Sequence, residues 1–261
     1  MSSEKNKKVE QLSHTKEEAL LGRRLLDIDA LCSKRYAVMS SAFLSETEIA
    51  YCEMLIHLFD SKCFFFGGYD GAERRVAVFL PDENYEQDDD EQVITALEIR
   101  HSSSIGHRDV LGSILGLGIE RDVVGDILIG NEKSYVIVTK EIVPYILQNF
   151  TKIGRNNISV SEVPFSSLEV PERKTEEIFS TVASLRLDCI AAEGFRLSRE
   201  SAQSAIKKQL VQVNHKIVES PSYNIKEKDV ISLRGKGKII LDSIGTNSRK
   251  GIIRVNILKF V

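Results

Sequence analysis

The sequence predicts an α+β protein with three parts: a helical N-terminal unit, a central α+β sandwich and a smaller, basic α+β module. Three observations carry this prediction. Apolar residues recur at helical spacing near the N-terminus, apolar strands alternate with helices in the middle, and short helices and strands rich in Lys and Arg fill the last third. With 261 residues, 42% of them apolar and 28% charged, the chain can form two or three domains.

Two helices are predicted in the N-terminal unit, residues 1–72, from apolar spacing and from the residues that precede them. Each begins with a hydroxyl residue followed three positions later by glutamate, the pattern of a capping box: Thr15 with Glu18, and Ser45 with Glu48. We therefore expect helices over residues 15–31 and 45–59, followed by a strand over 63–66 and a glycine-rich turn.

The central unit, residues 73–164, is predicted to place helices on one face of a sheet. Its expected order is β-β-α-β-β-α-β, with strands at 75–80, 92–101, 126–129, 135–138 and 157–163 and helices at 108–115 and 140–150. The acidic stretch 82–91 is interpreted as a solvated connection rather than a carboxylate metal site. Such an architecture leaves a sheet face or edge open, the kind of surface that single-stranded RNA binders use.

The stretch from Pro164 to Thr181 has two prolines and many Ser, Glu and Lys residues, so residues 165–182 are predicted to be a linker. The C-terminal module, residues 183–261, is predicted to begin with two helices. The first runs from Asp188 to Glu193 and is closed by Gly194, and Ser198 is placed to cap the second, over residues 199–209. Strands follow, joined by turns that contain Asn or Gly.

Charge is distributed unevenly along the chain. The net formal charge is −3, but residues 181–261 hold 15 Lys and Arg against 7 Asp and Glu, while residues 1–180 hold 20 against 31. A basic third on an acidic body suits a polyanion bound at one end of the molecule.

The cations of the C-terminal module stand near helix caps and turns, where a phosphate backbone can approach. The positive N-terminal end of the helix that Ser198 caps favours an anion, and Asn214 can take the positive φ of a two-residue turn. Lys207 and Lys208 would also stabilise the C-terminal end of this helix without any ligand. The candidate RNA-binding residues are Arg186, Arg196, Ser198, Arg199, Lys207, Lys208, Asn214, Lys216, Arg234 and Lys236.

Four separated elements of this module carry a specific resemblance: Arg186-Leu187-Asp188, Ser198-Arg199, the turn Val211-Gln212-Val213-Asn214 and the strand Asp229-Val230-Ile231-Ser232. In this order they resemble the RNA-binding domain of small-subunit ribosomal protein S-four, the S-four-type (αL) domain, over about residues 183–243. That domain also occurs in pseudouridine synthases, bacterial tyrosyl-tRNA synthetases and the heat-shock protein that rescues stalled large subunits.

Motifs further upstream narrow the family. They are the segments 66–74 (Phe-Gly-Gly-Tyr-Asp-Gly-Ala-Glu-Arg), 107–112, 115–121 and 124–127. With the C-terminal module they resemble the YlmH family of bacterial RNA-binding proteins over nearly the whole chain. The resemblance implies a middle domain that binds RNA, and the order of its elements predicts a ferredoxin/RRM-like fold. His107, Arg108 and Arg121 are a second candidate RNA surface; the alternative for His107 is a cap at the start of a helix. The resemblance also implies rRNA and tRNA as partners, on a large ribosomal subunit that carries an obstructed peptidyl-tRNA, in ribosome-associated quality control.

Two alternatives stand beside an RNA-binding factor: an RNA-modifying enzyme similar to pseudouridine synthases, and an adaptor linked to cell division. In the synthases the essential Asp lies in a Gly-Arg-Leu-Asp-like motif of a large catalytic domain, whereas here Leu185 replaces the Gly and 73 residues follow Asp188. His107-Arg108-Asp109 resembles a kinase catalytic loop, but Ile114 stands where that loop needs Asn. We therefore expect no enzyme, no cofactor and no metal.

The remaining features point to an ordinary intracellular protein. No apolar run reaches the length of a membrane-spanning helix, and the first residues lack the apolar core of a secretory signal. The cysteines lack Cys-x-x-Cys spacing and are expected to be free thiols: Cys32, Cys52, Cys63 and Cys189. We expect a cytoplasmic monomer.

Overall fold

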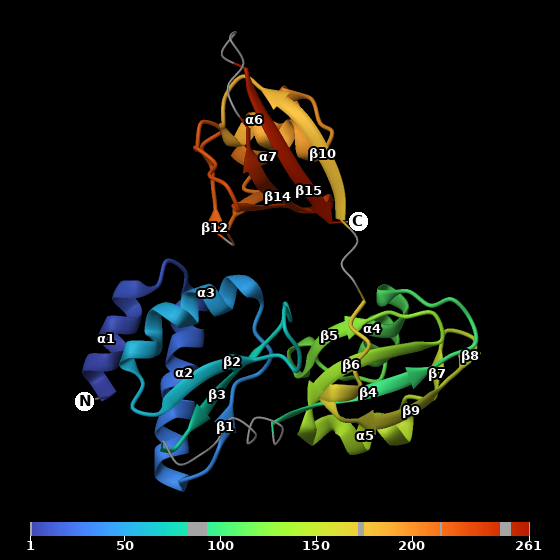
Figure 1. Ribbon diagram of the computed structural model, residues 1–261. Helices are drawn as coiled ribbons and strands as arrows, with labels where there is room; N and C mark the ends of the chain where they lie inside the picture. The colour runs from blue at the N-terminus through green and yellow to red at the C-terminus, as the bar shows by residue number, and fades with distance from the viewer. Residues whose placement is uncertain (1, 83–92, 172–174, 215, 246–251, 261) are drawn as a thin grey trace. The chain divides into compact units, whose positions relative to one another are not determined.

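The computed structural model describes residues 2–82, 93–171, 175–214, 216–245 and 252–260. These residues form two compact units, residues 1–171 and 172–261. The first unit contains a helical part with its own small sheet and a central α+β domain, and the second contains one sheet with two helices (Figure 1). The predicted α+β class is confirmed. The acidic stretch 82–91 lies, apart from Asp82, outside the described residues.

The N-terminal part packs three helices against a three-stranded antiparallel sheet. The helices are α1 (Ser2–Leu12), α2 (Lys16–Arg35) and α3 (Glu46–Leu55), and α3 continues into the 3-10 turn η1 (Ile56–Leu58). The strand order is β1 (Met39–Ser40), β3 (Val76–Leu80), β2 (Lys62–Phe66). Both helix starts are confirmed, because Thr15 Oγ1 accepts from the amide of Glu18, and Ser45 with Glu48 forms a complete capping box.

The predicted boundary at residue 72 is wrong, because it divides a hairpin. Strand β3 pairs along its whole length with β2, from Lys62 opposite Leu80 to Phe66 opposite Val76. All five residues of β3 are buried, and its neighbours on both sides belong to the N-terminal sheet. The N-terminal part therefore extends to Leu80, and the first strand predicted for the central domain belongs to it.

The central domain has the β-α-β-β-α-β order of ferredoxin-like folds. Its elements are β4 (Ile94–Arg100), α4 (His107–Leu115), η3 (Arg121–Val123), β5 (Val124–Leu128), β6 (Lys133–Thr139), η4 (Lys140–Ile142), α5 (Val143–Asn149), β7 (Lys152–Ile153), β8 (Asn156–Asn157) and β9 (Ser159–Val163). The antiparallel sheet order is β5-β6-β4-β9, and β7 and β8 form a separate small hairpin. Pro144 lies in the first turn of α5, where its missing N–H costs no helical hydrogen bond.

The face of this sheet opposite its helices is largely covered, which corrects the expectation of an open RNA-binding face. Ala96 and Ile137 pair across the face and are fully buried, as is Ile94. An apolar cluster seals this region with side chains from the N-terminal sheet and from η5 (Phe165–Ser167). The cluster includes Phe43, Val76, Val78, Leu80, Ile94, Ile137 and Phe165. Bases therefore cannot stack on the centre of this sheet as they do on an open RNA-binding sheet.

The C-terminal unit is a six-stranded antiparallel sheet with two helices on one face (Figure 1). The chain runs through β10 (Thr175–Val182), α6 (Leu187–Gly194), α7 (Arg199–Lys207), β11 (Val211–Val213), β12 (Lys216–Ile217), β13 (Val230–Leu233), β14 (Gly237–Ile244) and β15 (Ile253–Phe260). The sheet order is β10-β15-β14-β13-β11-β12.

The predicted linker over residues 165–182 is wrong for its second half, which is strand β10. This strand pairs with β15 along its whole length, from Thr175 opposite Phe260 to Val182 opposite Ile253. Ile178 and Val182 pack into the core while the residues between them are polar or exposed. Buried and exposed residues alternate along β10, as in a strand with one buried face. The many polar residues of the segment obscured this alternation in the sequence.

Candidate nucleic-acid interface

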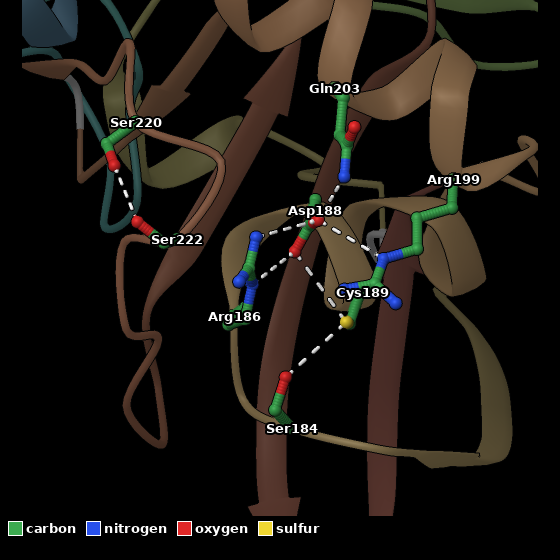
Figure 2. Close-up of polar contacts among 8 residues, drawn as sticks. All are labelled: Ser184, Arg186, Asp188, Cys189, Arg199, Gln203, Ser220 and Ser222. Atoms are coloured by element: carbon green, nitrogen blue, oxygen red, sulfur yellow. Dashed lines mark hydrogen bonds and ion pairs between the residues drawn. The ribbon is translucent and has the colours of Figure 1, made fainter.

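A buried carboxylate, Asp188, organises the surface where the predicted cations gather. Asp188 stands in the first turn of α6 and has no exposed surface. The side chains that donate to it come from three places: Arg186 just before α6, Cys189 within α6, and Arg199 and Gln203 on α7 (Figure 2). One acidic side chain thus joins the start of α6 to one face of α7.

The geometry at Asp188 is that of a charge-assisted network. Arg186 donates from Nε to Oδ1 at 3.0 Å and from Nη2 to Oδ2 at 3.2 Å, a two-point contact. Arg199 Nε and Gln203 Nε2 both donate to Oδ2, at 3.2 and 2.6 Å. Burial raises the pKa of Asp188, but the hydrogen bonds from Arg186, Gln203 and Arg199 outweigh it and bring the pKa to about 2.

The two arginines stay available to a ligand. Their side chains keep 40% of their surface exposed for Arg186 and 54% for Arg199. Each guanidinium has five N–H donors, and the contacts with Asp188 engage two from Arg186 and one from Arg199. Asp188 therefore fixes two planar cations in orientation while leaving donors that can reach phosphate oxygens.

Local sequence explains why these groups meet. The amides of Leu187 and Asp188 donate to the carbonyls of Tyr223 and Pro221, so a distant loop fixes the start of α6. Ser198 Oγ accepts from the amide of Ser201, which confirms it as the cap of α7. On α7, residues 199, 203 and 207 are spaced by four and share one helix face. Sequence reasoning missed Gln203, although its spacing from Arg199 was the available signal.

Several other predicted residues lie on the same unit but have different environments. Arg196 is exposed and pairs with Glu176 of β10. Lys207, Lys208, Lys216, Arg234 and Lys236 are exposed, the last two in the turn between β13 and β14. The structure therefore brings Arg186, Ser198 and Arg199 together around α6 and α7.

The side chain of Asn214 stabilises the turn that follows β11. Its φ is +48°, and its carboxamide is occupied at both ends: Nδ2 donates to Asp229 at 2.8 Å, and Oδ1 accepts from the amide of Val230 at 2.9 Å. The side chain holds the turn after β11 against β13, so we do not include it in the RNA surface.

The three residues of the second predicted surface, His107, Arg108 and Arg121, have different environments in the structure. Arg121 is half-buried and donates to the carbonyls of Val124 and Gly125. Burial lowers its pKa to about 10, with a contribution from Arg74. Partial burial and the neighbouring Arg121 cation also lower the pKa of His107. Arg108 is exposed and lines a groove of about 440 Å³.

The upstream motifs that carry the family resemblance meet at a junction inside the first unit. Asp126 accepts from the hydroxyl of Tyr69 and from the amides of Glu73 and Arg74, at 2.8, 2.7 and 3.1 Å. The guanidinium of Arg74 donates back to the carbonyls of Val124 and Phe43. The glycine-rich segment and the strand that begins at Val124 thus join the N-terminal part to the central domain.

Metal sites, membrane-spanning helices and cysteine chemistry were considered for the part of the chain that the structure describes. No group of three or more His, Cys, Asp or Glu side chains there is arranged to hold a metal ion. None of its helices is both long and apolar enough to span a bilayer. The four cysteines are free, and burial raises the pKa of the Cys52 and Cys63 thiols to about 12.

Comparisons with known proteins agree with this architecture. The family model described as "Putative RNA-binding domain in YlmH" matches residues 87–167, and the S4 domain model matches residues 185–231. A solved structure, the cell division protein ylmH from Streptococcus pneumoniae, superimposes with a TM-score of 0.53 at 20% identity. The match covers 61% of this chain and 98% of that one, and it shows a shared fold.

A second protein is similar to this chain over nearly its whole length. The Ribosome-associated protein quality control protein P2 of Bacillus subtilis (strain 168) is 31% identical over 243 residues. These residues are 92% of this chain and 94% of the relative, so the similarity spans the central domain and the S4 domain together. The chain therefore belongs to the YlmH family.

Proposed function

We propose that this protein is a non-catalytic factor that binds structured rRNA and tRNA on the large ribosomal subunit. In this role it acts, as a monomer in the cytoplasm, in the quality control of subunits that carry a stalled peptidyl-tRNA. The name of the Bacillus subtilis relative supports the link to ribosome-associated quality control, and the two matched domains support RNA as the ligand.

The observation that carries the proposal is the pair of arginines that Asp188 holds in place. A buried carboxylate that fixes Arg186 and Arg199 lowers the entropy cost of engaging two phosphates. Lys207 extends this cationic face of α7, and Ser198 caps the helix at its positive end. The contacts are of the kind that recognise a backbone by charge and shape rather than by base edges.

The same residue argues against the enzymatic alternative. In a pseudouridine-synthase-like site, Asp188 would have to reach a base. Its carboxylate is instead fully buried and accepts hydrogen bonds from four side chains, those of Arg186, Arg199, Gln203 and Cys189, the role of a structural anchor. We therefore assign Asp188 to positioning the arginines and propose no chemistry for it.

Co-sedimentation with large ribosomal subunits tests the proposal. Wild-type protein should pellet with the subunits and be released as the salt concentration rises. Arg199→Ala should weaken the association, and Lys207→Ala should weaken it modestly. Glu219→Gln is the control, because it removes an exposed charge of the same unit that is bonded to Gln209 and takes no part in the network around Asp188. Wild-type-level pelleting of both cation variants would refute the proposed surface.

The enzymatic alternative has its own readout. Large-subunit rRNA and tRNA incubated with the protein should keep an unchanged nucleoside composition by mass spectrometry. New modified nucleosides that disappear with Asp188→Asn would favour an RNA-modifying enzyme over a binding factor.

A further inference from the structure

The sheet of the C-terminal unit has a second face, which points away from α6 and α7. Strand β10 shows the alternation directly. Ile178 and Val182 enter the core, and Ser180 Oγ donates to Glu193 of α6 at 2.6 Å, so these residues face the helices. The residues between them, Phe179 and Thr181, therefore stand on the outer face.

An aromatic side chain stands exposed on this outer face. Phe179 is 75% exposed, the most exposed of the large apolar residues that the structure describes. It lies in the middle of an eight-residue strand, hydrogen-bonded on one side to β15. A single exposed Phe needs no explanation by itself, so its neighbours decide what it can do.

The neighbours of Phe179 are hydrogen-bonding groups and a cation, in register across three strands. Asn256 of β15 lies opposite Phe179, and Ser243 of β14 lies opposite Asn256. In the next row, Arg254 lies opposite Thr181. These side chains line a hollow of about 620 Å³.

Two of these polar side chains can form an ion pair or a hydrogen bond that no described residue provides. The side chain of Arg254 is exposed and has no ion pair with any described residue. Asn256 Nδ2 donates weakly to Asp242 at 3.4 Å, while its Oδ1 is shielded from solvent and has no hydrogen-bond donor among the described residues 175–214, 216–245 and 252–260. An unsatisfied shielded acceptor is costly, and a donor from a ligand would relieve it after a small rotation of the side chain.

We propose that this outer face binds an unpaired RNA nucleotide, with its base stacked on Phe179. The exocyclic amino group of the base donates to Asn256 Oδ1, and Arg254 pairs with the adjacent phosphate. The phosphate lies on the Arg254 side because Glu177, two residues before Phe179 on the same face, repels it from the other. The proposal rests on the proposed function only in taking RNA as the ligand.

The chemistry favours a nucleotide over a protein partner. A ring exposed beside amide, hydroxyl and guanidinium groups is the arrangement by which sheets bind single-stranded RNA. The excess of 15 Lys and Arg over 7 Asp and Glu in residues 181–261 favours a polyanionic ligand for the unit as a whole. The unit then has two RNA surfaces, a cationic one on α6 and α7 for structured backbone and an aromatic one on β10, β14 and β15 for an unstacked base.

Fluorescence of a stacked base tests the proposal with full-length protein. The probe is a single-stranded oligouridylate of six nucleotides that contains one central 2-aminopurine, whose emission falls when it stacks. Wild-type protein should quench it. Phe179→Leu, which keeps an apolar side chain without a ring face, should lose the quench and bind about 5- to 150-fold more weakly. Phe179→Tyr should keep the quench, and Arg254→Gln should weaken binding.

Arg199→Ala separates this inference from the proposed function. It should weaken pelleting with large subunits while leaving the quench of the short probe at the wild-type level. A wild-type quench in Phe179→Leu would overturn the proposal, as would absence of any quench by wild-type protein. A quench that Arg199→Ala removes and Phe179→Leu leaves unchanged would also overturn it, because the probe would then lie on the helical face.

Discussion

Replacing Asp188 by Asn removes the charge that fixes Arg186 and Arg199 while keeping the shape of the side chain. The new amide group would point N–H donors at guanidinium N–H donors, since the present carboxylate accepts from Arg186 at both oxygens. The hydrogen bonds from Arg199 and Gln203 converge on Oδ2, so an Asn can retain only part of the network. We predict that Asp188→Asn destabilises the packing of α6 against α7.

The magnitude follows from the pKa of the carboxyl. Its fall from the ordinary aspartate value of 3.8 to about 2 corresponds to about 2 kcal/mol of favourable interaction with the charged form. Removal of one member of a fully buried ion pair costs about 3–5 kcal/mol. The two arginines are about half exposed and can rehydrate, so the value for a fully buried pair is too high here. We expect Asp188→Asn to lower the local stability by about 2 kcal/mol, the figure given by the pKa.

Hydrogen–deuterium exchange followed by mass spectrometry gives the local free energy of opening for the peptides that contain α6 and α7. Asp188→Asn should lower this free energy by about 2 kcal/mol, whereas Glu219→Gln should leave it within about 0.5 kcal/mol. If Asp188→Asn exchanged like the wild type in both helices, the network would not contribute to stability and the reasoning would be refuted.

The same residue predicts a pH dependence. Because the folded-state pKa of Asp188 lies below its unfolded value, the stabilisation is fully present above about pH 3.8 and is lost as the pH falls toward 2. In the wild type, the free energy of opening for α6 and α7, corrected for the pH dependence of intrinsic amide exchange, should fall over this window. In Asp188→Asn this local contribution should be absent, so the difference between the two proteins should shrink as the pH falls.

Three further predictions concern other parts of the molecule. Ser198→Ala should cost about 1 kcal/mol of unfolding free energy by removing the cap of α7, and Ser198→Asp should restore most of it in urea titrations. Gly125→Ala should destabilise the first unit by about 1–3 kcal/mol in thermal unfolding, because the new Cβ would lie 2.5 Å from Phe43 Cε1; an unchanged midpoint would contradict the packing. His107 should titrate below 6.5 by NMR, and Arg121→Gln should raise its pKa, since partial burial and the Arg121 cation both disfavour the imidazolium.

Features with a local physical cause could be predicted from the sequence. Thr15, Ser45 and Ser198 each begin a helix as expected, because a cap depends on groups three residues apart. The positive φ of Asn214 was foreseen for the same reason. The hydrogen bonds of its carboxamide to Asp229 and to the amide of Val230 were not predicted, because both partners lie far along the chain, at the start of β13.

Features that depend on distant partners were missed. Strand β10 is polar enough to resemble a linker, and only β15, more than seventy residues later, makes it a strand. The covered face of the central sheet depends on Val76 and Val78 of a strand assigned to the wrong domain. The motif with Asp188 was recognised, but its role as the anchor of two arginines requires knowing that it is buried and that Gln203 faces it.

The salt dependence of binding to large ribosomal subunits tests the central claim most directly, namely that Asp188 presents Arg186 and Arg199 to RNA phosphates. The association constant is measured over a series of monovalent salt concentrations for the wild type and for the double variant Arg186→Ala/Arg199→Ala. If both guanidinium groups contact phosphates, the slope of log K against log salt should be shallower in the variant by about two units. An unchanged slope, with an unchanged association constant, would contradict the claim.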